Sequence, residues 1–317
     1  MEHADRITAR AAGRPRALAG ALGVLGLVGG IAALGLLLPV SEALIVEDAV
    51  GVSVFALATN LLLGYGGLVS FGQAAFYGSG AYLVTLGWRH WHWSFWLALA
   101  LAPFLGAALA LPIGLIALRT RKLYFALLTL AFSQLFFVLA EKQFTFTGGD
   151  DGSFVKFWAT QPRHGFLLVL AVASLCALAL WWIVSSPFGL VLRATRENRE
   201  RMEALGVNVF AHQLAAFMIS GAFCSVAGVL FVVYSQTSYP TLLQWTTSGE
   251  PVIMAVVGGM FAFLGPVIGA FVYTLGHHYL IQHTTHWQLI LGAVLLAIVL
   301  LRPDGLAGLL QLRRRKT

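Results

Sequence analysis

The chain has 317 residues, of which 59% are hydrophobic, and its mean hydropathy is +0.82. This composition excludes an ordinary soluble domain, because several apolar runs approach the roughly 20 residues that cross a bilayer. The formal net charge of +7 would favour nucleic acid as a partner of a soluble protein. Here the basic residues lie beside apolar runs, so we assign them to membrane topology and expect no nucleic-acid partner.

The pattern predicts an all-α polytopic membrane helical bundle with roughly nine or ten membrane segments, some of them broken or re-entrant. In chain order we expect a cytoplasmic segment at residues 1–16, a transmembrane domain at 17–309 and a basic cytoplasmic tail at 310–317. The apolar runs fall at about 17–40, 49–63, 68–86, 95–118, 123–140, 166–185, 213–234, 251–283 and 287–301.

Glycines interrupt two of these regions. The stretch from Gly64 to Gly80 has a glycine density that indicates a broken helix or very close packing, since each glycine weakens a helix by about 1 kcal/mol relative to alanine. The run 251–283 contains Gly258-Gly259 and Gly265-Pro266, so we divide it into a half-helix or short span, a break, and a full helix from about Pro266. Paired interruptions in two halves of a chain are typical of an internal repeat with a translocation path at its interface.

Lysines and arginines are distributed asymmetrically about these spans. With the N-terminus inside, sixteen of the twenty lie in cytoplasmic segments, and the other side holds Arg89, Lys142, Lys156 and Arg163. The positive-inside rule therefore predicts that both termini are cytoplasmic. The tryptophan-rich segment 88–96 then lies at the outer interface as an aromatic belt.

No Asp, Glu, Lys or Arg falls clearly inside a predicted span, although ion-driven transporters usually carry such residues. This argues against a self-powered transporter, while sodium sites made of carbonyl and hydroxyl oxygens stay open. Neutral polar and glycine positions in the spans serve either as helix contacts or as the lining of a path. Our candidates for the translocation path are Asn60, Gly67, Ser70, Gln73, Ser79, Thr129, Gln134, Gly258 and Gly259.

The sequence gives no sign of bound metal or of covalent chemistry. Cys176 and Cys224 lie in separate apolar runs without metal-ligand spacing, so we interpret them as small core- or lipid-facing residues. The histidines at positions 277, 278, 283 and 286 fix no coordination geometry and suit an interface beside Trp287. No GxxxxGK[ST] motif is present, so the chain cannot bind ATP by a P-loop. We expect no metal, no cofactor and no enzyme activity.

The most charged segment follows the run 166–185, in a loop at about 186–211. From position 193 to position 203 it places four arginines and three glutamates in eleven residues. As one helix, it carries an apolar and amide stripe and ends at a capping glycine, Gly206. Each of the predicted ion pairs, Glu197–Arg201, Arg196–Glu200 and Arg199–Glu203, would contribute about 0.2–0.5 kcal/mol. Such a helix either docks on a partner or lies on lipid headgroups.

Short motifs run through residues 50–309. They comprise Asn60 to Gly67 and on to Tyr82, Leu118 to Phe132, Thr147 to Gly152, Ser186 to Asn198, Gly206 to Asn208, Gly258-Gly259, Gly265-Pro266, Gly269-Ala270, and Pro303 to Leu306. Together they resemble the permease subunits of branched-chain amino-acid ABC importers, the LivM type in particular. The chain departs from that family's pattern at Leu123, where a glycine is usual, and in part at Val69, Phe71 and Gln73.

The resemblance implies a permease with several protein partners in a bacterial inner membrane. These are a second homologous permease subunit, two cytoplasmic ATP-binding subunits and a periplasmic or extracytoplasmic substrate-binding protein. The implied cargo is branched-chain, aliphatic amino acids, and urea or short amides are the nearest alternative. An ion-coupled secondary transporter acting alone is the alternative from a different class.

The resemblance also assigns roles to two loops. The charged segment takes the position of the family's coupling helix, and its ATPase-coupling candidates are Arg193, Arg196, Glu197, Asn198, Glu200, Met202, Leu205 and Gly206. The loop 147–152 lies outside by the charge count and forms either a plain tight turn or a contact with the binding protein. The candidates for that contact are Thr147, Gly148, Gly149, Asp150 and Asp151.

Overall fold

The structure is a computed structural model that describes residues 30, 35, 38–120, 122–155, 162–301 and 305–308. Its elements in chain order are α2 (Val40–Asn60), the π-helical turn η1 (Leu61–Tyr65), α3 (Gln73–Trp91), α4 (Phe95–Ala117), α5 (Lys122–Lys142), α6 (Phe144–Thr147), η2 (Gly149–Asp151), β1 (Ser153–Phe154), α7 (Pro162–Ser185), α8 (Pro187–Glu197), α9 (Arg199–Ala204), α10 (Val209–Ser235), β2 (Thr237–Ser238), η4 (Pro240–Leu243), α11 (Trp245–Gly258), α12 (Gly265–His283) and α13 (Trp287–Leu301). The predicted segments 1–16 and 310–317, and nearly all of 17–40, lie outside the described residues.

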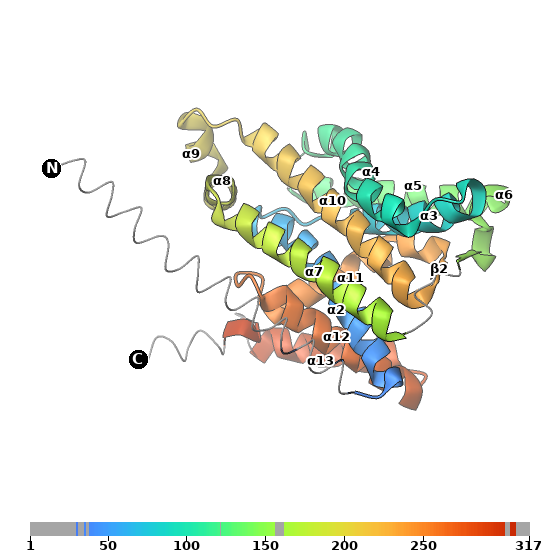
Figure 1. Ribbon diagram of the computed structural model, residues 1–317. Coiled ribbons are helices and arrows are strands. Elements are labelled where there is room, and N and C mark those ends of the chain that lie inside the picture. The colour runs from blue at the N-terminus through green and yellow to red at the C-terminus, as the bar shows by residue number, and fades with distance from the viewer. Residues whose placement is uncertain are drawn as a thin grey trace, which may run out of the picture.

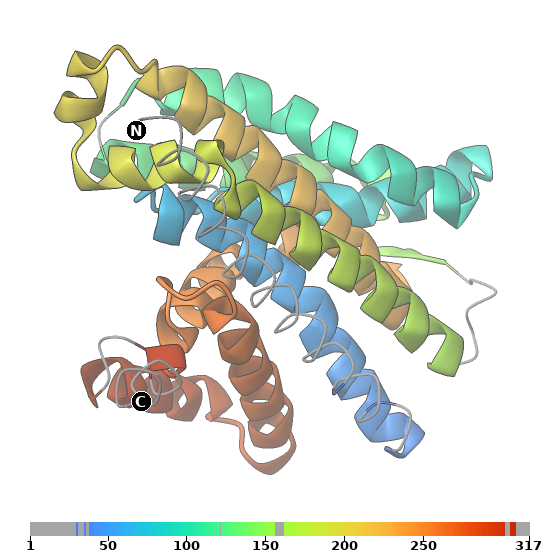
Figure 2. The ribbon, with the colours of Figure 1, turned by 60° about the vertical axis from the view of Figure 1, so that its left-hand side comes forward.

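The helices gather around α10, which packs against α2, α3 and α4 (Figure 1). Helix α7 lies beside α2, and α11 and α12 form a second group that packs on α2 (Figure 2). Helices α8 and α9 lie at one end of the bundle, while α6 and the antiparallel pair of β1 and β2 lie at the other. Apart from this two-residue ribbon, the regular structure of the described residues is helical, as predicted.

Five helical stretches within the described residues are long and apolar enough to cross a membrane. They are Glu42–Tyr65, Phe95–Ala117, Leu123–Lys142, Arg163–Ser185 and Val209–Ser235. The last four match predicted runs to within four residues at each end, and α13 matches the run 287–301. The first begins seven residues before the predicted start at residue 49. The fold is thus a helical membrane bundle, and the total of nine or ten segments stays a prediction.

Small residues let α10 approach its neighbours closely. A side chain at Gly228 would collide with the carbonyl of Tyr77 in α3, and one at Gly80 would collide with the carbonyl of Ser225 in α10. Since lipid provides no hydrophobic drive for helix association, such contacts stabilise membrane bundles by van der Waals packing. Close packing therefore explains part of the glycine density between residues 64 and 80.

Two non-helical segments interrupt the bundle, and each contains a glycine with a positive φ angle. Residues 66–72 connect η1 to α3, and residues 259–264 connect α11 to α12. Gly67 and Gly259 have φ angles of 67° and 108°, a region that residues with a Cβ rarely adopt. The second break confirms the predicted division of the run 251–283, because α12 begins at Gly265 with Pro266 in its first turn.

Helix α3 begins inside the bundle rather than at its end. The side-chain oxygen of Gln73 accepts hydrogen bonds from Ser220 and Cys224, each at 3.2 Å, and both donors lie near the middle of α10. The backbone N–H of Ala74 donates to the hydroxyl of Ser248 in α11 at 2.8 Å. The first turns of α3 and α11 therefore meet halfway along α10, as expected for broken or re-entrant segments.

Candidate functional site

A cavity of about 260 Å³ lies between α2, α3, α10, η4, α11 and α12. We call it the carboxylate cavity, because Asp48 of α2 and Glu250 of α11 line it. Its apolar lining consists of Val52, Phe55, Phe231, Leu242 and Met254, and its hydroxyl and imidazole lining of Tyr77, Tyr239, Thr241, Thr247, Tyr273, Thr274 and His277. The volume is just below the roughly 300–1,000 Å³ of sites for drug-sized ligands, so the cavity suits a small metabolite.

The two carboxylates differ in their partners. Glu250 lies beside the hydroxyl of Tyr273 in α12, which also lines the cavity. Asp48 is half-buried and has no hydrogen-bond or ion-pair partner among the described residues. No lysine or arginine occurs in the described lining. Carboxylates in a membrane protein's interior are costly and mark substrate or ion pathways, so the cavity is the leading candidate site.

These carboxylates correct the prediction that the spans contain no charged residue. Helix α2 contains Glu47 and Asp48, and α11 contains Glu250. The predicted runs begin at residues 49 and 251, directly after Asp48 and Glu250, because hydropathy ends a run at a charge whereas helical hydrogen bonding continues through it. An acidic residue directly before a predicted apolar run is the sequence feature that indicates both carboxylates. The argument against ion-coupled transport loses its basis.

An aromatic wall extends the negative character of the cavity. The ring of Phe55 stacks on Tyr77 with centroids 4.4 Å apart, Tyr77 lies 5.9 Å from Phe231, and Phe231 lies 6.0 Å from Tyr239. Aromatic faces carry partial negative charge and attract cations. His277 also lines the cavity, and its expected position at a membrane interface stays a prediction. Apart from His277, the charged and aromatic groups of the lining attract cations.

A second polar cluster, which we call the arginine junction, lies where α8 meets the bundle. It consists of Arg193 and Arg196 with Gly64, Tyr65 and Phe261. The Arg196 guanidinium donates to the carbonyl of Gly64 and lies over the Phe261 ring, 5.0 Å from its centroid. Arg193 lies over the Tyr65 ring at 5.7 Å. Because Gly64 precedes the first break and Phe261 lies in the second, Arg196 contacts both interrupted segments.

The two interrupted segments also contact each other directly. The side-chain amide of Asn60 donates to the carbonyl of Met260 at 3.1 Å. The glycine-rich segments that resemble each other in the two halves of the sequence therefore meet in space beside the charged loop. Along α2 this junction lies roughly 20 Å from Asp48, given 1.5 Å per helical residue.

The charged loop forms two helices, so the expected single helix is wrong. Helix α8 ends at Glu197, and Asn198 adopts extended angles of φ −153° and ψ 99°. The Asn198 side chain then caps α9 by accepting from the Arg201 N–H at 2.9 Å, a role in which asparagine is strongly preferred. The break separates Glu197 from Arg201 and Arg196 from Glu200, so two of the predicted ion pairs are divided between α8 and α9. Among the described residues the pair that forms is Arg199–Glu203, at 2.8 Å.

The predicted glycine cap is confirmed, and the coupling candidates divide into two groups. Gly206 has φ 80°, and the Val207 N–H donates to the carbonyl of Met202 at 3.1 Å, which completes a Schellman motif. Arg193 and Arg196 are half-buried and contact the bundle. The exposed candidates are Glu197, Asn198, Glu200, Leu205 and Gly206, and Met202 is half-buried.

The predicted path residues make contacts within the chain, and none of them lines the carboxylate cavity. Asn60, Ser70, Gln73, Thr129, Gly258 and Gly259 are buried, Ser79 and Gln134 are half-buried, and Gly67 is exposed. Thr129 accepts a hydrogen bond from the Phe71 N–H at 3.2 Å. Ser79 lines a separate, mostly apolar cavity of about 490 Å³ that also includes Trp91. Their assignment to a translocation path stays a prediction.

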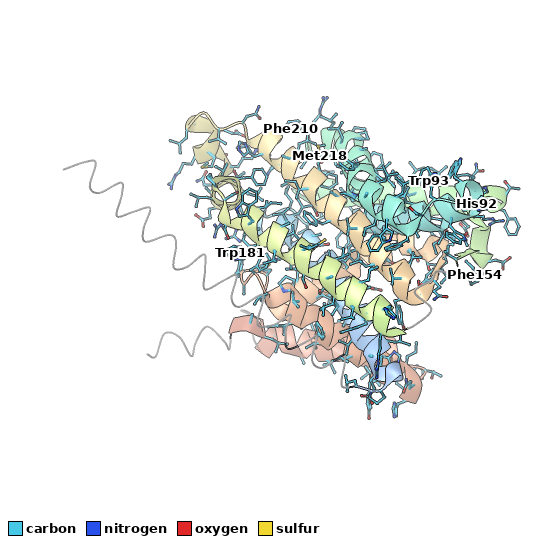
Figure 3. The ribbon with its side chains drawn as sticks, in the orientation of Figure 1. His92, Trp93, Phe154, Trp181, Phe210 and Met218 are labelled. Atoms are coloured by element: carbon cyan, nitrogen blue, oxygen red, sulfur yellow. The ribbon has the colours of Figure 1, made fainter. Side chains whose placement is uncertain are left out.

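The loop 147–152 lies at the end opposite α9. Gly148 and Gly149 have φ angles of 89° and 58°, Thr147 is buried, and Asp150 and Asp151 are exposed. Figure 3 shows His92, Trp93 and Phe154 gathered at this end, far from Phe210 at the start of α10. The ring of Trp93 stacks on Trp91 at 5.4 Å. This end therefore presents the aromatic segment that we expected at a membrane interface.

The described residues contain no group of three or more His, Cys, Asp or Glu that could hold a metal ion. Both cysteines are buried and free, and Cys224 donates to Gln73. They act as small core residues, as we interpreted them.

Interrupted membrane helices around a small polar cavity are typical of transport proteins. The family model described as the permease component of branched-chain amino acid transport systems matches residues 43–300. The chain belongs to this family of transport permease components.

Individual relatives are distant. The chain is 25% identical over 283 residues to the high-affinity branched-chain amino acid permease protein LivM of Salmonella typhimurium, which covers 80% of this chain and 67% of that protein. It is 30% identical over 163 residues to the autoinducer 2 import permease protein LsrC of Escherichia coli O157:H7, covering 48% of this chain and 46% of that one. It is 26% identical over 157 residues to the probable permease LivH of Methanocaldococcus jannaschii, covering 45% and 46%. No solved structure gives a significant match.

Proposed function

We propose that this chain is the membrane permease subunit of an ABC importer for branched-chain, aliphatic amino acids, driven by ATP hydrolysis in separate subunits. It works in a bacterial inner membrane with both termini in the cytoplasm. It pairs with a second, homologous permease and takes substrate from a periplasmic or extracytoplasmic binding protein, with residues 147–151 as the contact. Similarity to LivM supports the cargo, and similarity to LivH supports a related partner subunit.

One observation carries the coupling part of the proposal: the charged loop is exposed on one side and tied to both interrupted segments on the other. Outward it presents Glu197, Glu200 and Leu205, and the Leu205 side chain is 71% exposed on an otherwise charged surface. Inward, Arg196 contacts Gly64 and Phe261. A docked ATPase that changes conformation would therefore move both interrupted segments through one side chain.

The test reverses the charge of the exposed face. We expect the double variant Glu197→Lys and Glu200→Lys to retain its fold and to lose coupling. ATP hydrolysis should continue in reconstituted vesicles, while leucine uptake falls by about tenfold or more, because opposed charges at an interface are essential to its register. Uptake and hydrolysis are measured in parallel, with thermal unfolding in detergent as the check on the fold.

The matched control is Glu42→Lys, which reverses an exposed glutamate in the first turn of α2. It should leave the ratio of uptake to hydrolysis unchanged. An unchanged ratio in the double variant would remove the charged loop from coupling, although the transport function could still stand.

The carboxylate cavity favours one other candidate, an ion-coupled secondary transporter acting alone, because Asp48 and Glu250 could bind a coupling ion. Vesicles that contain this chain alone separate the two. Uptake under an ion gradient supports the secondary transporter, whereas dependence on added ATPase and binding protein supports the importer. A thermal-shift screen of the binding protein with leucine, urea and short amides separates the possible cargoes.

A further inference from the structure

We infer that the carboxylate cavity binds the ammonium end of the translocated substrate, with Asp48 and Glu250 as its charged ligands. The inference rests on the proposed function, because it takes the ligand from the cargo. It assigns a binding site to residues of one permease subunit, between the helices of both halves of the chain.

The charge balance of the cavity is the first argument. Two carboxylates line it, and no lysine or arginine of the described lining offsets them. Glu250 lies beside Tyr273, and Asp48 is half-buried without a hydrogen-bond or ion-pair partner among the described residues. A carboxylate that faces a cavity without a partner is available to a cationic ligand.

The aromatic wall is the second, independent argument. Phe55, Tyr77, Phe231 and Tyr239 form a continuous series of ring contacts, with centroids 4.4 to 6.0 Å apart. All four residues line the cavity, and an ammonium group gains free energy against any aromatic face that it reaches there. The same wall, with Val52 and Met254, offers apolar surface to an aliphatic chain. An alkylammonium thus matches both the charge and the apolar part of the lining.

The position of the cavity is the third argument. Its walls come from α11 and α12, which flank the second break, and from α2 and α3, which lie before and after the first. A ligand held there contacts elements that the arginine junction also joins. Binding and coupling can therefore communicate through α2 over roughly 20 Å.

The lining of the cavity determines which net charge a ligand should carry. Because two carboxylates face the cavity, a purely cationic alkylammonium should bind more tightly than a zwitterionic amino acid, and an anionic analogue should not bind. Zwitterionic leucine would then bind weakly, as a transient site on a transport path requires if it is to release its substrate.

The experiment measures equilibrium binding to the assembled transporter in nanodiscs without ATP, by isothermal titration calorimetry at neutral pH. The probes are isopentylamine, leucine and 4-methylpentanoate, which share the branched chain and differ in charge. We expect that order of affinity, with no measurable binding of 4-methylpentanoate. Asp48→Asn and Glu250→Gln should each weaken isopentylamine binding by about tenfold or more, as for the loss of a hydrogen bond to a charged group.

The neighbouring acid provides a matched control. Glu47 is buried one position away, but it lies beside Gly165 of α7 and does not line the cavity. Glu47→Gln should therefore change isopentylamine binding by no more than about twofold. Thermal unfolding shows whether a variant has failed to fold. If either Asp48→Asn or Glu250→Gln fails, the other still tests the inference.

Three results would overturn the inference: equal losses in Asp48→Asn and Glu47→Gln, binding of 4-methylpentanoate as tight as that of isopentylamine, or sodium binding that depends on Asp48 without any binding of the amine. The last result would assign the carboxylates to an inorganic cation. None of these bears on ATP-dependent leucine uptake, which is measured separately, so failure of this inference is distinguishable from failure of the importer assignment.

Discussion

The arginine junction and the carboxylate cavity lie along the same helix, α2, but they differ in whether their charged side chains have partners within the chain. At the junction, Arg196 donates to the Gly64 carbonyl and lies over the Phe261 ring, so its charge has partners from the chain itself. In the cavity, Asp48 has no such partner among the described residues. A half-buried charge with partners contributes to the fold, whereas one without a partner loses solvation and gains nothing in return.

Under the two proposals above, this difference separates a coupling site from a ligand site. The junction contacts both interrupted segments, which is what coupling to a moving partner requires. The cavity leaves the Asp48 carboxylate without a partner, which is what recognition of a cation requires. Variants of the two regions should therefore affect stability with opposite signs, although both reduce transport.

The largest expected effect tests this contrast directly. Arg196→Ala should lower the free energy of unfolding by about 1.5–3 kcal/mol, the range for a hydrogen bond to a charged group. Asp48→Asn should leave the thermal unfolding temperature unchanged or raise it, because it removes an unpaired carboxylate. Thermal unfolding in detergent and leucine uptake, measured on the same preparations, check both variants.

The control for the junction is Arg201→Ala, since Arg201 is exposed in α9. It should stay within about 0.5 kcal/mol of the unmodified chain. If Arg196→Ala matched this control, or if Asp48→Asn proved the more destabilising change, the contrast between the regions would be lost.

The sequence predicts the helices far better than the two sites. The runs 95–118 and 287–301 are almost the same as α4 and α13, because uninterrupted apolar stretches leave few alternatives. The cavity was missed because Asp48 and Glu250 border their runs and are 202 positions apart, so only the packing of α11 against α2 brings them together. The inward direction of Arg196 depends likewise on Gly64 and Phe261, which no local pattern relates to it.

An intermediate effect is expected at Gly67, which borders the junction. Its φ of 67° costs a residue with a Cβ about 1–2 kcal/mol, and a Cβ there would also press against the Arg196 side chain. Gly67→Ala should therefore destabilise the protein and reduce coupled uptake. Gly249→Ala is the matched control, because nothing lies within 4 Å of a Cβ at that position. Equal unfolding temperatures for the two variants would mean that the junction tolerates displacement of Arg196.

The smallest effect concerns the outward side of the charged loop. There we expect the cap at Asn198 to stabilise α9 more than the exposed ion pair does. Asn198→Ala removes the cap of α9 and should cost about 1 kcal/mol, whereas Glu203→Gln breaks an exposed ion pair worth about 0.2–0.5 kcal/mol. Amide hydrogen exchange in α9 reads both. If α9 exchanges faster in Asn198→Ala than in Glu203→Gln while exchange around Gly64 is unchanged, α9 lies outside the junction. If Asn198→Ala accelerates exchange around Gly64 as much as exchange in α9, the junction extends into α9, because the cap at Asn198 then holds Arg196 in place.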